Sequence, residues 1–584
     1  MISKLLFEVS WEVCNKVGGI YTVITSKIEV IQRHFKGEYH LIGPFLPEKP
    51  PLDFVEETPP AAFKDAFGKL RDMGIKCHYG TWNVAGKPNT ILIDITSFAS
   101  QRNGIKQRLW DEYQIDSLNT EYYEFDQPVI WATAVGITLE AISREGSDHI
   151  IGHFHEWLAG AGLLYLKSAK SPISTVFTTH ATMLGRSIAA SGRNLYSLLD
   201  SINPLQEAQN MGIQAKHLME VACAANATVF TTVSEITAIE AEKLLGRYPD
   251  VLLLNGLNIA AFPTFEERSI KHKIFKQKIF EFLLYYFFPY YSFDLSETLI
   301  FFTCARYEFR DKGIDIMIEA LSRLNQRLKA ENSKRTIVTF IWVPANISGI
   351  DAELLETRKY FKDLKGDIDD ESDDIKNRLI SALVAKKPVK IDTLLDAELL
   401  EEIQRKVQRL VRDGRPPLST HNLCDPNDAV LQSLRKNGLT NNPDDRVKVI
   451  FYPAYLTGAD SLLDTSYYES MLGSHLGIFP SYYEPWGYTP LECAALGTCA
   501  LTTDVAGFGR YIAKKASSKV PGIYVLPRYN DDDPSGKLAD IMHRFSRLNK
   551  QQRVKNKIEA KRLASSADWK IFIKNYLEAY RLAQ

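Results

Sequence analysis

The chain has 584 residues, 45% of them hydrophobic and 11% aromatic, which is enough for two or more domains with cores of their own. Its 70 Lys and Arg residues balance 71 Asp and Glu residues, so no net field attracts polyanions. This balance argues against a role on nucleic acid or on a membrane surface.

The first predicted elements lie in the N-terminal half, where short apolar runs alternate with helix-like stretches. These runs are residues 5–9, 39–42, 90–93, 150–154, 174–177, 228–233 and 251–254. In the second half they are residues 299–304, 337–343, 447–451, 477–479, 501–503 and 522–526. Runs that are apolar on both faces are typical of parallel strands covered by helices. The predicted fold class is α/β, with two doubly wound Rossmann-like domains that face each other across a cleft.

The predicted domain boundary falls where the strand pattern thins, between about Asn258 and Glu297. We expect an N-terminal domain over residues 1–264, completed by a C-terminal helix over 566–584, and a second domain over 265–565. A charged helical insertion occupies about 351–414, in which Leu399, Ile403 and Val407 recur at helical spacing. It forms either a hairpin packed on its own domain or a subunit contact.

The sequence contains no pattern that favours membrane insertion or secretion. The most apolar window, Phe282 to Phe293, is only 12 residues long and contains Pro289, so we expect it to pack at a domain junction. The start of the sequence lacks a signal-peptide pattern. Seven scattered cysteines without a Cys-x-x-Cys pair favour a reducing, cytoplasmic compartment.

Lys16-Val17-Gly18-Gly19 follows the first predicted strand and precedes a helix. Adjacent glycines let the backbone approach a ligand, and the lysine supplies a charge for phosphate. A plain strand-to-helix turn is the alternative.

His153 and His155 end another predicted strand and share a face. Because no third ligand is marked nearby in the sequence, we expect hydrogen-bonded histidines and no metal.

Two pairs of residues that suit a sugar nucleotide follow predicted strands: a histidine for a sugar hydroxyl with an arginine for a phosphate, and two cations for a diphosphate. His180 closes one strand with Arg186 six residues on, and Arg306 and Lys312 repeat this layout in the second half. Guanidinium groups bind phosphate oxygens bidentately, so these cations suit a diphosphate, with a solvated charged surface as the alternative.

The most informative stretch is Ser481 to Gly497, which links a predicted strand to a helix. We expect Thr489 as N-cap, Pro490 in the first helical position and Glu492 completing a capping box. Glu484 has no such structural explanation, so we expect it to act in chemistry on a sugar nucleotide bound at this helix N-terminus.

Together these motifs resemble glycogen synthase of the animal and fungal type, a family of retaining glycosyltransferases with the two-domain GT-B fold. The resemblance rests on Glu484-Pro-Trp-Gly-Tyr-Thr-Pro-Leu-Glu492, Lys16-Val-Gly-Gly, His153-Phe-His-Glu-Trp157, Thr178 to Arg186, Asn255-Gly-Leu-Asn258 and Arg306 to Lys312. It runs from Phe7 to about Trp569.

The resemblance implies transfer of glucose from UDP-glucose to the 4-OH at a non-reducing end of an α-1,4-glucan such as glycogen, without a metal or other cofactor. It assigns Arg186, Arg306 and Lys312 to the diphosphate, His180 to the donor glucose and Glu484 to a place beside the sugar. Tyr467 would stack on uracil and Glu492 approach the ribose. Donor binding would further involve Lys16, Gly18, Gly19, Tyr488 and Thr489. We also expect a homo-oligomer, with a tetramer formed through the helical insertion as one form.

Two departures from the family pattern bear on regulation. The stretch matching a glucose 6-phosphate-sensing arginine helix keeps Arg553 and Arg562 but has Lys550, Gln551, Lys557 and Glu559 at other arginine positions. Fewer forked donors should weaken phosphate binding. Since the chain also lacks the phosphorylated extensions of the regulated enzymes, we expect a less regulated relative.

Three other functions are weighed against this one. The chain could use another nucleotide donor or acceptor, or it could be a glucan-binding relative without activity, although a binder has no use for cations opposite a carboxylate. Dinucleotide-dependent oxidoreduction is disfavoured because no Gly-x-Gly-x-x-Gly follows a predicted strand.

Overall fold

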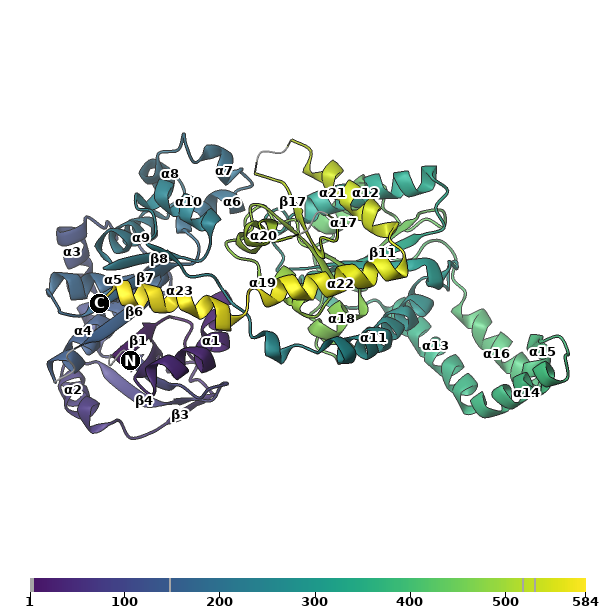
Figure 1. Ribbon diagram of the computed structural model, residues 1–584, viewed down its shortest axis with the longest axis horizontal. Coiled ribbons are helices and arrows are strands. Elements are labelled where there is room, and N and C mark those ends of the chain that lie inside the picture. Colours follow the sequence, from purple (N-terminus) through teal and green to yellow (C-terminus); the bar gives the residue numbers. More distant parts are fainter. Residues whose placement is uncertain (1–4, 146–148, 517–518, 530–531) are drawn as a thin grey trace.

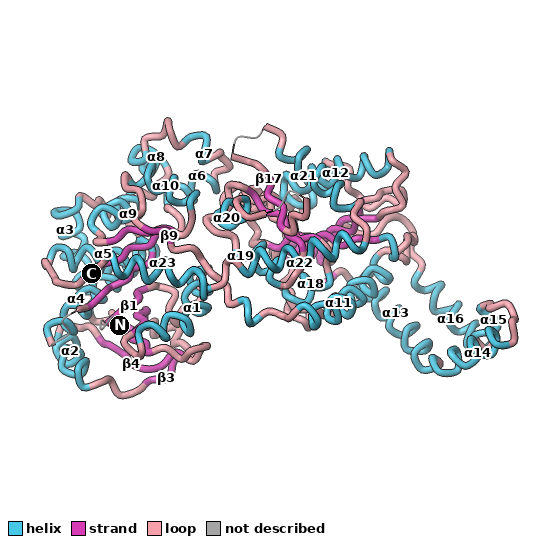
Figure 2. The backbone as a smooth tube through the Cα atoms, viewed as in Figure 1, coloured by secondary structure: helices cyan, strands magenta, loops and turns pink. Residues whose placement is uncertain are grey.

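The computed structural model describes residues 5–145, 149–516, 519–529 and 532–584. It has two lobes, each with its own sheet flanked by helices (Figures 1 and 2). The predicted α/β class is confirmed, because all strands of the second large sheet and most of the first pair in parallel.

The first lobe is built on a nine-stranded sheet with the order β3-β4-β5-β2-β1-β6-β7-β8-β9. The strands are β1 (Leu5–Val9), β2 (Tyr39–Pro44), β3 (Phe54–Glu56), β4 (Lys76–Trp82), β5 (Asn89–Asp94), β6 (Ile150–His155), β7 (Ser174–Thr179), β8 (Val229–Thr232) and β9 (Val251–Leu252). Each of the runs predicted as strands in this half contains one. The antiparallel strands β3, at the edge of the sheet, and β4, next to it, were not predicted, because polar residues interrupt their apolar runs.

Helices cover both faces of this sheet. They are α1 (Gly19–Phe35), α2 (Ala61–Asp72), α3 (Arg102–Tyr113), α4 (Gln127–Arg144), α5 (Glu156–Ser168), α6 (Met183–Ala190), α7 (Leu195–Leu198), α8 (Pro204–Asn210), α9 (Gln214–Asn226) and α10 (Glu235–Leu245), with a π-helical turn at Tyr122–Asp126 before α4. The last helix of the chain, α23 (Trp569–Leu582), returns to this lobe and packs against α1 and β9. The indole N–H of Trp569 donates to Ser26 Oγ at 2.8 Å, which fixes the start of α23 on α1.

The second lobe contains a six-stranded parallel sheet with the order β14-β11-β10-β15-β16-β17. The strands are β10 (Thr298–Cys304), β11 (Thr336–Trp342), β14 (Val447–Tyr452), β15 (Leu476–Ile478), β16 (Cys499–Thr503) and β17 (Ile523–Leu526), beside an antiparallel pair of β12 (Ile347–Ile350) and β13 (His421–Leu423). Its helices are α11 (Phe265–Tyr286), α12 (Ile314–Ala330), α17 (Ala429–Lys436), α18 (Tyr467–Gly473), α19 (Tyr488–Ala495), α20 (Gly507–Ala513), α21 (Pro534–Ser546) and α22 (Lys550–Ser565).

The predicted helical insertion forms an arm that projects from the second lobe (Figure 1). It consists of α13 (Ala352–Asp370), α14 (Ser372–Val384), α15 (Ile391–Leu394) and α16 (Ala397–Leu410). The base of the arm packs on the lobe where α13 contacts α11, whereas α14 and α15 form a tip away from both sheets. The predicted alternative of a hairpin packed on its own domain therefore holds only for the base of the arm.

The aromatic window Phe282 to Phe293 lies within the second lobe, so its predicted place at a domain junction is wrong. Phe282 packs against Phe340 of β11 with ring centroids 5.7 Å apart. The Tyr285 hydroxyl donates to the Leu462 carbonyl at 2.7 Å. The window is apolar because it covers one face of the second sheet. Among the described residues, no helix combines the length and the apolar character needed to cross a bilayer.

Candidate active site

The order of strands identifies where a ligand should bind in each lobe. In the first sheet the chain runs outward from β1 to β2 on one side and from β6 to β7 on the other, so the order reverses between β1 and β6. In the second sheet it reverses between β10 and β15. Ligands of doubly wound sheets bind beyond the carboxyl ends of the strands at such switch points. The predicted site residues follow β1, β7, β10 and β15, except Tyr467, which starts α18 after β14.

In the second lobe, the structure brings Lys312 and Glu484 together. The loop after β10 supplies Lys312 and the loop after β15 supplies Glu484, and their charged groups lie 2.7 Å apart. Arg306 is 74% exposed and pairs with Glu308 at 2.9 Å. The same Glu308 lies 3.8 Å from Lys312, so the two cations that this lobe offers to a diphosphate are paired with carboxylates of the protein.

Close packing of the two loops fixes the Lys312–Glu484 pair. Gly313 adopts a positive φ of 67°, and a Cβ there would lie 2.1 Å from the Pro480 carbonyl oxygen, so only glycine permits this approach. The Tyr482 N–H donates to the Asp311 carbonyl at 2.8 Å. Lys312 therefore cannot move without the segment that carries Glu484.

The start of α19 differs from the predicted one. Gly487, with φ 108°, takes the N-cap position and Tyr488 begins the helix, so Thr489 is not the cap. Glu492 does not complete a capping box: its two carboxylate oxygens accept hydrogen bonds from Tyr467 at 2.9 Å and Tyr468 at 3.0 Å. A carboxylate held by two tyrosines of α18 is available to a ligand, which suits the predicted contact with a ribose better than a cap would.

The contacts of Tyr488 and Thr489 suit residues that support the fold. The Tyr488 hydroxyl donates to the carbonyl of Gly256 at 3.2 Å, which connects α19 to the segment that follows the first sheet. Thr489 is half-buried in the first turn of α19. Both residues lie beside Glu492 and Tyr467, and neither points to a function of its own.

In the first lobe, Arg186 reaches solvent from the start of α6 while a group of buried carboxylates surrounds it. Within the described residues it has no ion pair closer than 4.0 Å, although the fields of Glu156, Glu220 and the second-lobe residue Glu308 act on it. Burial raises the pKa of Glu156 above its usual value, with Arg186 opposing the shift. A guanidinium with uncommitted donors close to a carboxylate of the other lobe is suited to bind an anion.

Glu156 is a functional candidate that sequence analysis missed. It starts α5 with a positive φ of 64°, a strained conformation for a residue with a side chain. Its carboxylate accepts a hydrogen bond from the His180 N–H at 2.8 Å and so joins the loops after β6 and β7. The signal was present in the sequence, because Glu156 directly follows the His153–His155 pair.

The glycine loop after β1 is already occupied by a side chain of the protein. Glu12 accepts hydrogen bonds from the N–H groups of Gly18 at 2.8 Å and Tyr21 at 2.9 Å, which are the free donors at the start of α1. Gly18, Gly19 and Lys16 are exposed beside it. An anionic ligand at this helix N-terminus would have to displace Glu12.

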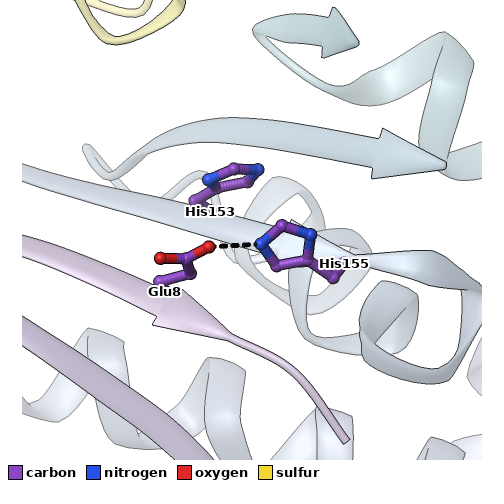
Figure 3. A group of neighbouring side chains, drawn as sticks. All are labelled: Glu8, His153 and His155. Carbon is purple, nitrogen blue, oxygen red and sulfur yellow. Dashed lines mark hydrogen bonds and ion pairs between the residues drawn. The ribbon is translucent and has the colours of Figure 1, made fainter. Parts of the chain in front are cut away.

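The histidines after β6 have a third acidic neighbour that the sequence did not mark. Glu8 of β1 lies beside His153 and His155, because β1 and β6 pair in register (Figure 3). All three residues are buried, and their ligand atoms lie within 4.8 Å of one another. The fold therefore supplies a third candidate ligand that lies far from the two histidines in the sequence.

Glu8, His153 and His155 already have protein partners in hydrogen bonds and an ion pair. Glu8 pairs with the buried Lys27 and accepts from Tyr39 at 2.6 Å. His153 bonds to Tyr580 of α23 at 2.9 Å and to Thr178 at 2.7 Å. With Lys27 already compensating the charge of Glu8, the donor set fits a buried ion-pair network better than a metal site.

The network ends at His180 and fixes the positions of its protons. Glu8 accepts from His155 Nε2 at 2.6 Å, so neutral His155 has its lone pair at Nδ1, which lies 2.9 Å from His180 Nε2. His180 Nε2 therefore donates, leaving its Nδ1 as an acceptor. Burial lowers the pKa of both His155 and His180, which keeps the imidazoles neutral.

The two lobes touch next to this site. The Tyr483 hydroxyl, adjacent to Glu484, donates to Glu240 of α10 at 2.9 Å, and α20 packs against α10. Burial raises the pKa of Glu240 to about 7, and its Oε2 has no hydrogen-bond partner among the residues that the structure describes. This contact holds the Glu484 loop against the lobe that carries Arg186 and His180.

Comparison with known proteins yields a family match across almost the whole chain. A family model described as glycogen synthase matches residues 8–584. The chain is 38% identical to glycogen [starch] synthase isoform 2 of Saccharomyces cerevisiae, over 100% of this chain and 86% of the yeast protein. It is 36% identical to the liver glycogen [starch] synthase of Rattus norvegicus, over 99% of this chain and 83% of the rat protein.

Among solved structures, the fold is similar to the catalytic domain of starch synthase IV from Arabidopsis thaliana, bound to ADP and acarbose. The TM-score is 0.54 at 13% identity, covering 100% of this chain and 99% of that one. An α,α-trehalose 6-phosphate synthase from Burkholderia multivorans has a TM-score of 0.50 at 10% identity, over 100% of this chain and 97% of that one. These similarities identify the predicted GT-B arrangement.

Proposed function

The chain belongs to the glycogen synthase family and is a glycosyltransferase, and we propose that it transfers glucose from UDP-glucose to the 4-OH at the non-reducing end of an α-1,4-glucan, with retention of configuration. The family membership supports a nucleotide-sugar donor and a glucan acceptor. The identity of the nucleotide, the stereochemistry and the roles of individual residues are the proposal.

The observation that carries the proposal is the pairing of Lys312 with Glu484 at the switch point of the second sheet, with Arg186 of the first lobe near Glu308. A carboxylate and two cations from the two lobes therefore lie near one another. Ligands of doubly wound sheets bind beyond the carboxyl ends of the strands, so these charged groups lie where a substrate is expected.

The proposed chemistry follows from the charges that develop. When UDP departs, negative charge grows on the diphosphate while the sugar ring becomes positive. Lys312 and Arg186 offset the first charge, and Arg306 joins them by exchanging Glu308 for phosphate. Glu484, whose carboxylate lies 2.7 Å from the Lys312 ammonium group, stabilises the positive charge on the ring. The acceptor nitrogen of His180 receives a hydrogen bond from a hydroxyl of the donor glucose.

The nucleoside would lie on the other side of the diphosphate, against α18 and α19. Tyr467 offers its ring to the base, and Glu492, which two tyrosines hold in place, accepts hydrogen bonds from the ribose. Closure of the lobes through contacts such as Tyr483–Glu240 would exclude water, which competes with the glucan as acceptor.

We propose that transfer needs no metal, because the protein's own cations neutralise the diphosphate. Chelation with EDTA should leave the rate of transfer unchanged. A loss of activity that Mg²⁺ or Zn²⁺ restores would contradict this part of the proposal.

A cytoplasmic location and an oligomer are also proposed. All seven cysteines, each within the described residues, are unpaired, which suits a reducing compartment. The projecting arm offers apolar side chains for self-association, and a tetramer is one form it could build.

The direct test is incorporation of labelled glucose from UDP-glucose into glycogen. Wild-type protein should extend glycogen, and an α-1,4-specific glucosidase should release the label, as retention requires. Glu484→Gln should lower kcat by about 100-fold or more, because it removes a preorganised charge beside the reacting carbon. Absence of transfer by the wild type, or full activity of the variant, would contradict the proposal.

Competition between donors separates the alternatives. Labelled ADP-glucose used in preference to UDP-glucose would point to another nucleotide donor. Binding of glycogen without transfer from either donor would point to a glucan-binding relative without activity.

A further inference from the structure

A pocket of about 540 Å³ lies at the carboxyl ends of β2 and β5 in the first lobe. Its volume is within the range typical of small-molecule sites, about 300–1,000 Å³. None of the residues assigned above to the donor lines it. The pocket therefore has space that the proposed donor site does not use.

Aromatic side chains form much of the wall of this pocket. Trp11 and Trp131 pack edge to face with centroids 5.2 Å apart, and Tyr122 and Tyr123 do the same at 5.1 Å. Tyr123 is 76% exposed, so its ring is not there to fill a core. Exposed aromatic faces pack against the C–H faces of sugar rings and combine apolar contact with polar edges.

The charges around the pocket exclude an anionic ligand. No Lys, Arg or His residue lines it, and its charged residues are Glu48 and Asp94. Carboxylates repel phosphates but accept hydrogen bonds from hydroxyl groups. The indole N–H of Trp131, which is fully buried, has no hydrogen-bond partner in the described structure and adds an unused donor to the wall. This chemistry suits a neutral polyhydroxyl ligand.

Residues of the pocket neighbour residues of the candidate active site. Trp11 precedes Glu12, whose charge acts on Arg186. Phe125, in the same π-helical turn as Tyr122 and Tyr123, stacks on Trp157 at 5.6 Å with the rings 9° from parallel. Trp157 in turn follows Glu156. A chain whose end reached the reaction centre could continue over these aromatic residues.

We propose that this aromatic pocket binds the glucose units behind the accepting end of an α-glucan chain. The inference rests on the proposed function for the identity of the ligand. It makes Trp11 and Tyr123 determinants of how tightly the acceptor binds, while the donor site is left unchanged.

The test is binding of maltoheptaose to the full chain by calorimetry, without any donor. Tyr123→Ala and Trp11→Ala should each weaken binding about tenfold, the effect of losing an aromatic contact worth somewhat more than 1 kcal/mol. Tyr123→Phe keeps the ring and should bind nearly as well as the wild type. Trp110→Ala, which removes a 47% exposed tryptophan from α3 outside the pocket, is the matched control.

A kinetic measurement separates the acceptor from the donor. Tyr123→Ala should raise the KM for maltoheptaose about tenfold and leave the KM for UDP-glucose unchanged. Because Tyr123 is on the surface, the variant should unfold at the same temperature as the wild type.

Failure of the inference and failure of the proposed function give different results. Equal maltoheptaose binding by the wild type, Tyr123→Ala and Trp11→Ala, or no measurable binding by the wild type, would overturn the pocket. Binding that depends on Tyr123 in a protein that transfers no glucose would support the pocket and overturn the proposed function.

Discussion

At the residue scale, the active-site candidates depend on carboxylates that sequence motifs did not single out. Glu8, Glu12, Glu156 and Glu240 are buried around His180 and Arg186. Each is hydrogen-bonded to a neighbouring element, so the loops after β1, β6 and β7 form one unit. Buried carboxylates in such numbers cost stability unless their hydrogen bonds are made, which ties the geometry of the site to the fold.

The first prediction concerns the proton positions along Glu8, His155 and His180. Replacing His155 with Phe leaves His180 Nε2 without an acceptor and frees the imidazole to change tautomer. We expect kcat to fall about tenfold, in the range lost when a supporting hydrogen bond is removed, with the affinity for UDP unchanged. The measurements are steady-state kinetics and UDP titration.

His40→Phe is the control for this prediction, since His40 is buried in the same sheet but outside the network. If His155→Phe retained the wild-type kcat, the network would have a structural role only.

The second prediction concerns Glu240, whose folded pKa of about 7 exceeds its ordinary value of 4.5. Between these pH values the folded state holds a proton that the unfolded state releases, so the stabilisation present below pH 4.5 is lost as pH rises to 7. Relative to Glu240→Gln, the wild type should lose up to about 3 kcal/mol between pH 4.5 and 8.

Urea unfolding of both proteins at pH 5 and pH 8 measures this difference. Glu242→Gln, an exposed change on the same helix, should show no such trend. If the difference in the free energy of unfolding between the wild type and Glu240→Gln did not vary with pH, burial would not raise the pKa of Glu240 as stated.

Residue contacts explain why the sequence predicted some side chains and not others. Local sequence pattern was enough to predict the candidates that lie in loops or helix starts soon after a strand. These are His180, Arg186, Arg306, Lys312 and Glu484. Glu8 joins His155 only through pairing of β1 with β6, which no local pattern reveals. The same limit applied to Glu492, whose tyrosine partners are on another helix.

At the scale of elements, continuous apolar runs located the parallel strands well because both of their faces are buried. The antiparallel strands β3 and β4 and the start of α19 were missed or misplaced. In α19 a single glycine with positive φ, Gly487, overrode the capping signal of Thr489. Tertiary packing, rather than propensity, set these boundaries.

The projecting arm makes a prediction about self-association. Its tip exposes Ile380, Leu383, Val384 and Ile391 by 59%, 62%, 79% and 61%. Exposed apolar clusters of this kind usually mark interfaces. The double change Leu383→Asp and Val384→Asp should reduce the sedimentation coefficient without changing kcat.

Lys387→Asp, an exposed charge change at the same tip, should leave the assembly intact. A wild-type protein that sediments as a monomer at all accessible concentrations would contradict the proposed role of the arm.

Helix α22 carries the residues expected to bind a sugar phosphate weakly. Lys557 is buried beside His272, and burial, reinforced by Arg268 and Arg553, lowers its pKa to about 7. At neutral pH it is charged only part of the time. The exposed Arg562 is paired with Glu559 at 2.6 Å, and a ligand would have to compete with that carboxylate.

We therefore expect glucose 6-phosphate to stimulate transfer weakly at pH 8 and more strongly at pH 6, where Lys557 is protonated. The measurement is the ratio of rates with and without the effector across this range. Lys557→Arg should remove the pH dependence, because arginine stays charged. Strong stimulation at pH 8 would contradict the expectation.

At the scale of the whole molecule, the two lobes bring groups from distant parts of the chain close together. Arg186 comes from the first sheet, and Lys312 and Glu484 come from the second. The chain passes from the first lobe to the second after β9 and returns after α22, and α23 then packs on the first lobe. The two lobes are therefore linked by two stretches of chain. The arrangement follows from the reversal of strand order in each sheet.

The central claim is that cations from both lobes neutralise a departing UDP beside Glu484. A crystal structure of the protein with bound UDP tests it most directly. We predict that Arg306 leaves Glu308 and that Arg306, Lys312 and Arg186 each lie within about 3 Å of a diphosphate oxygen. UDP bound elsewhere, or bound here with Arg306 still paired to Glu308 and Arg186 in solvent, would contradict the claim.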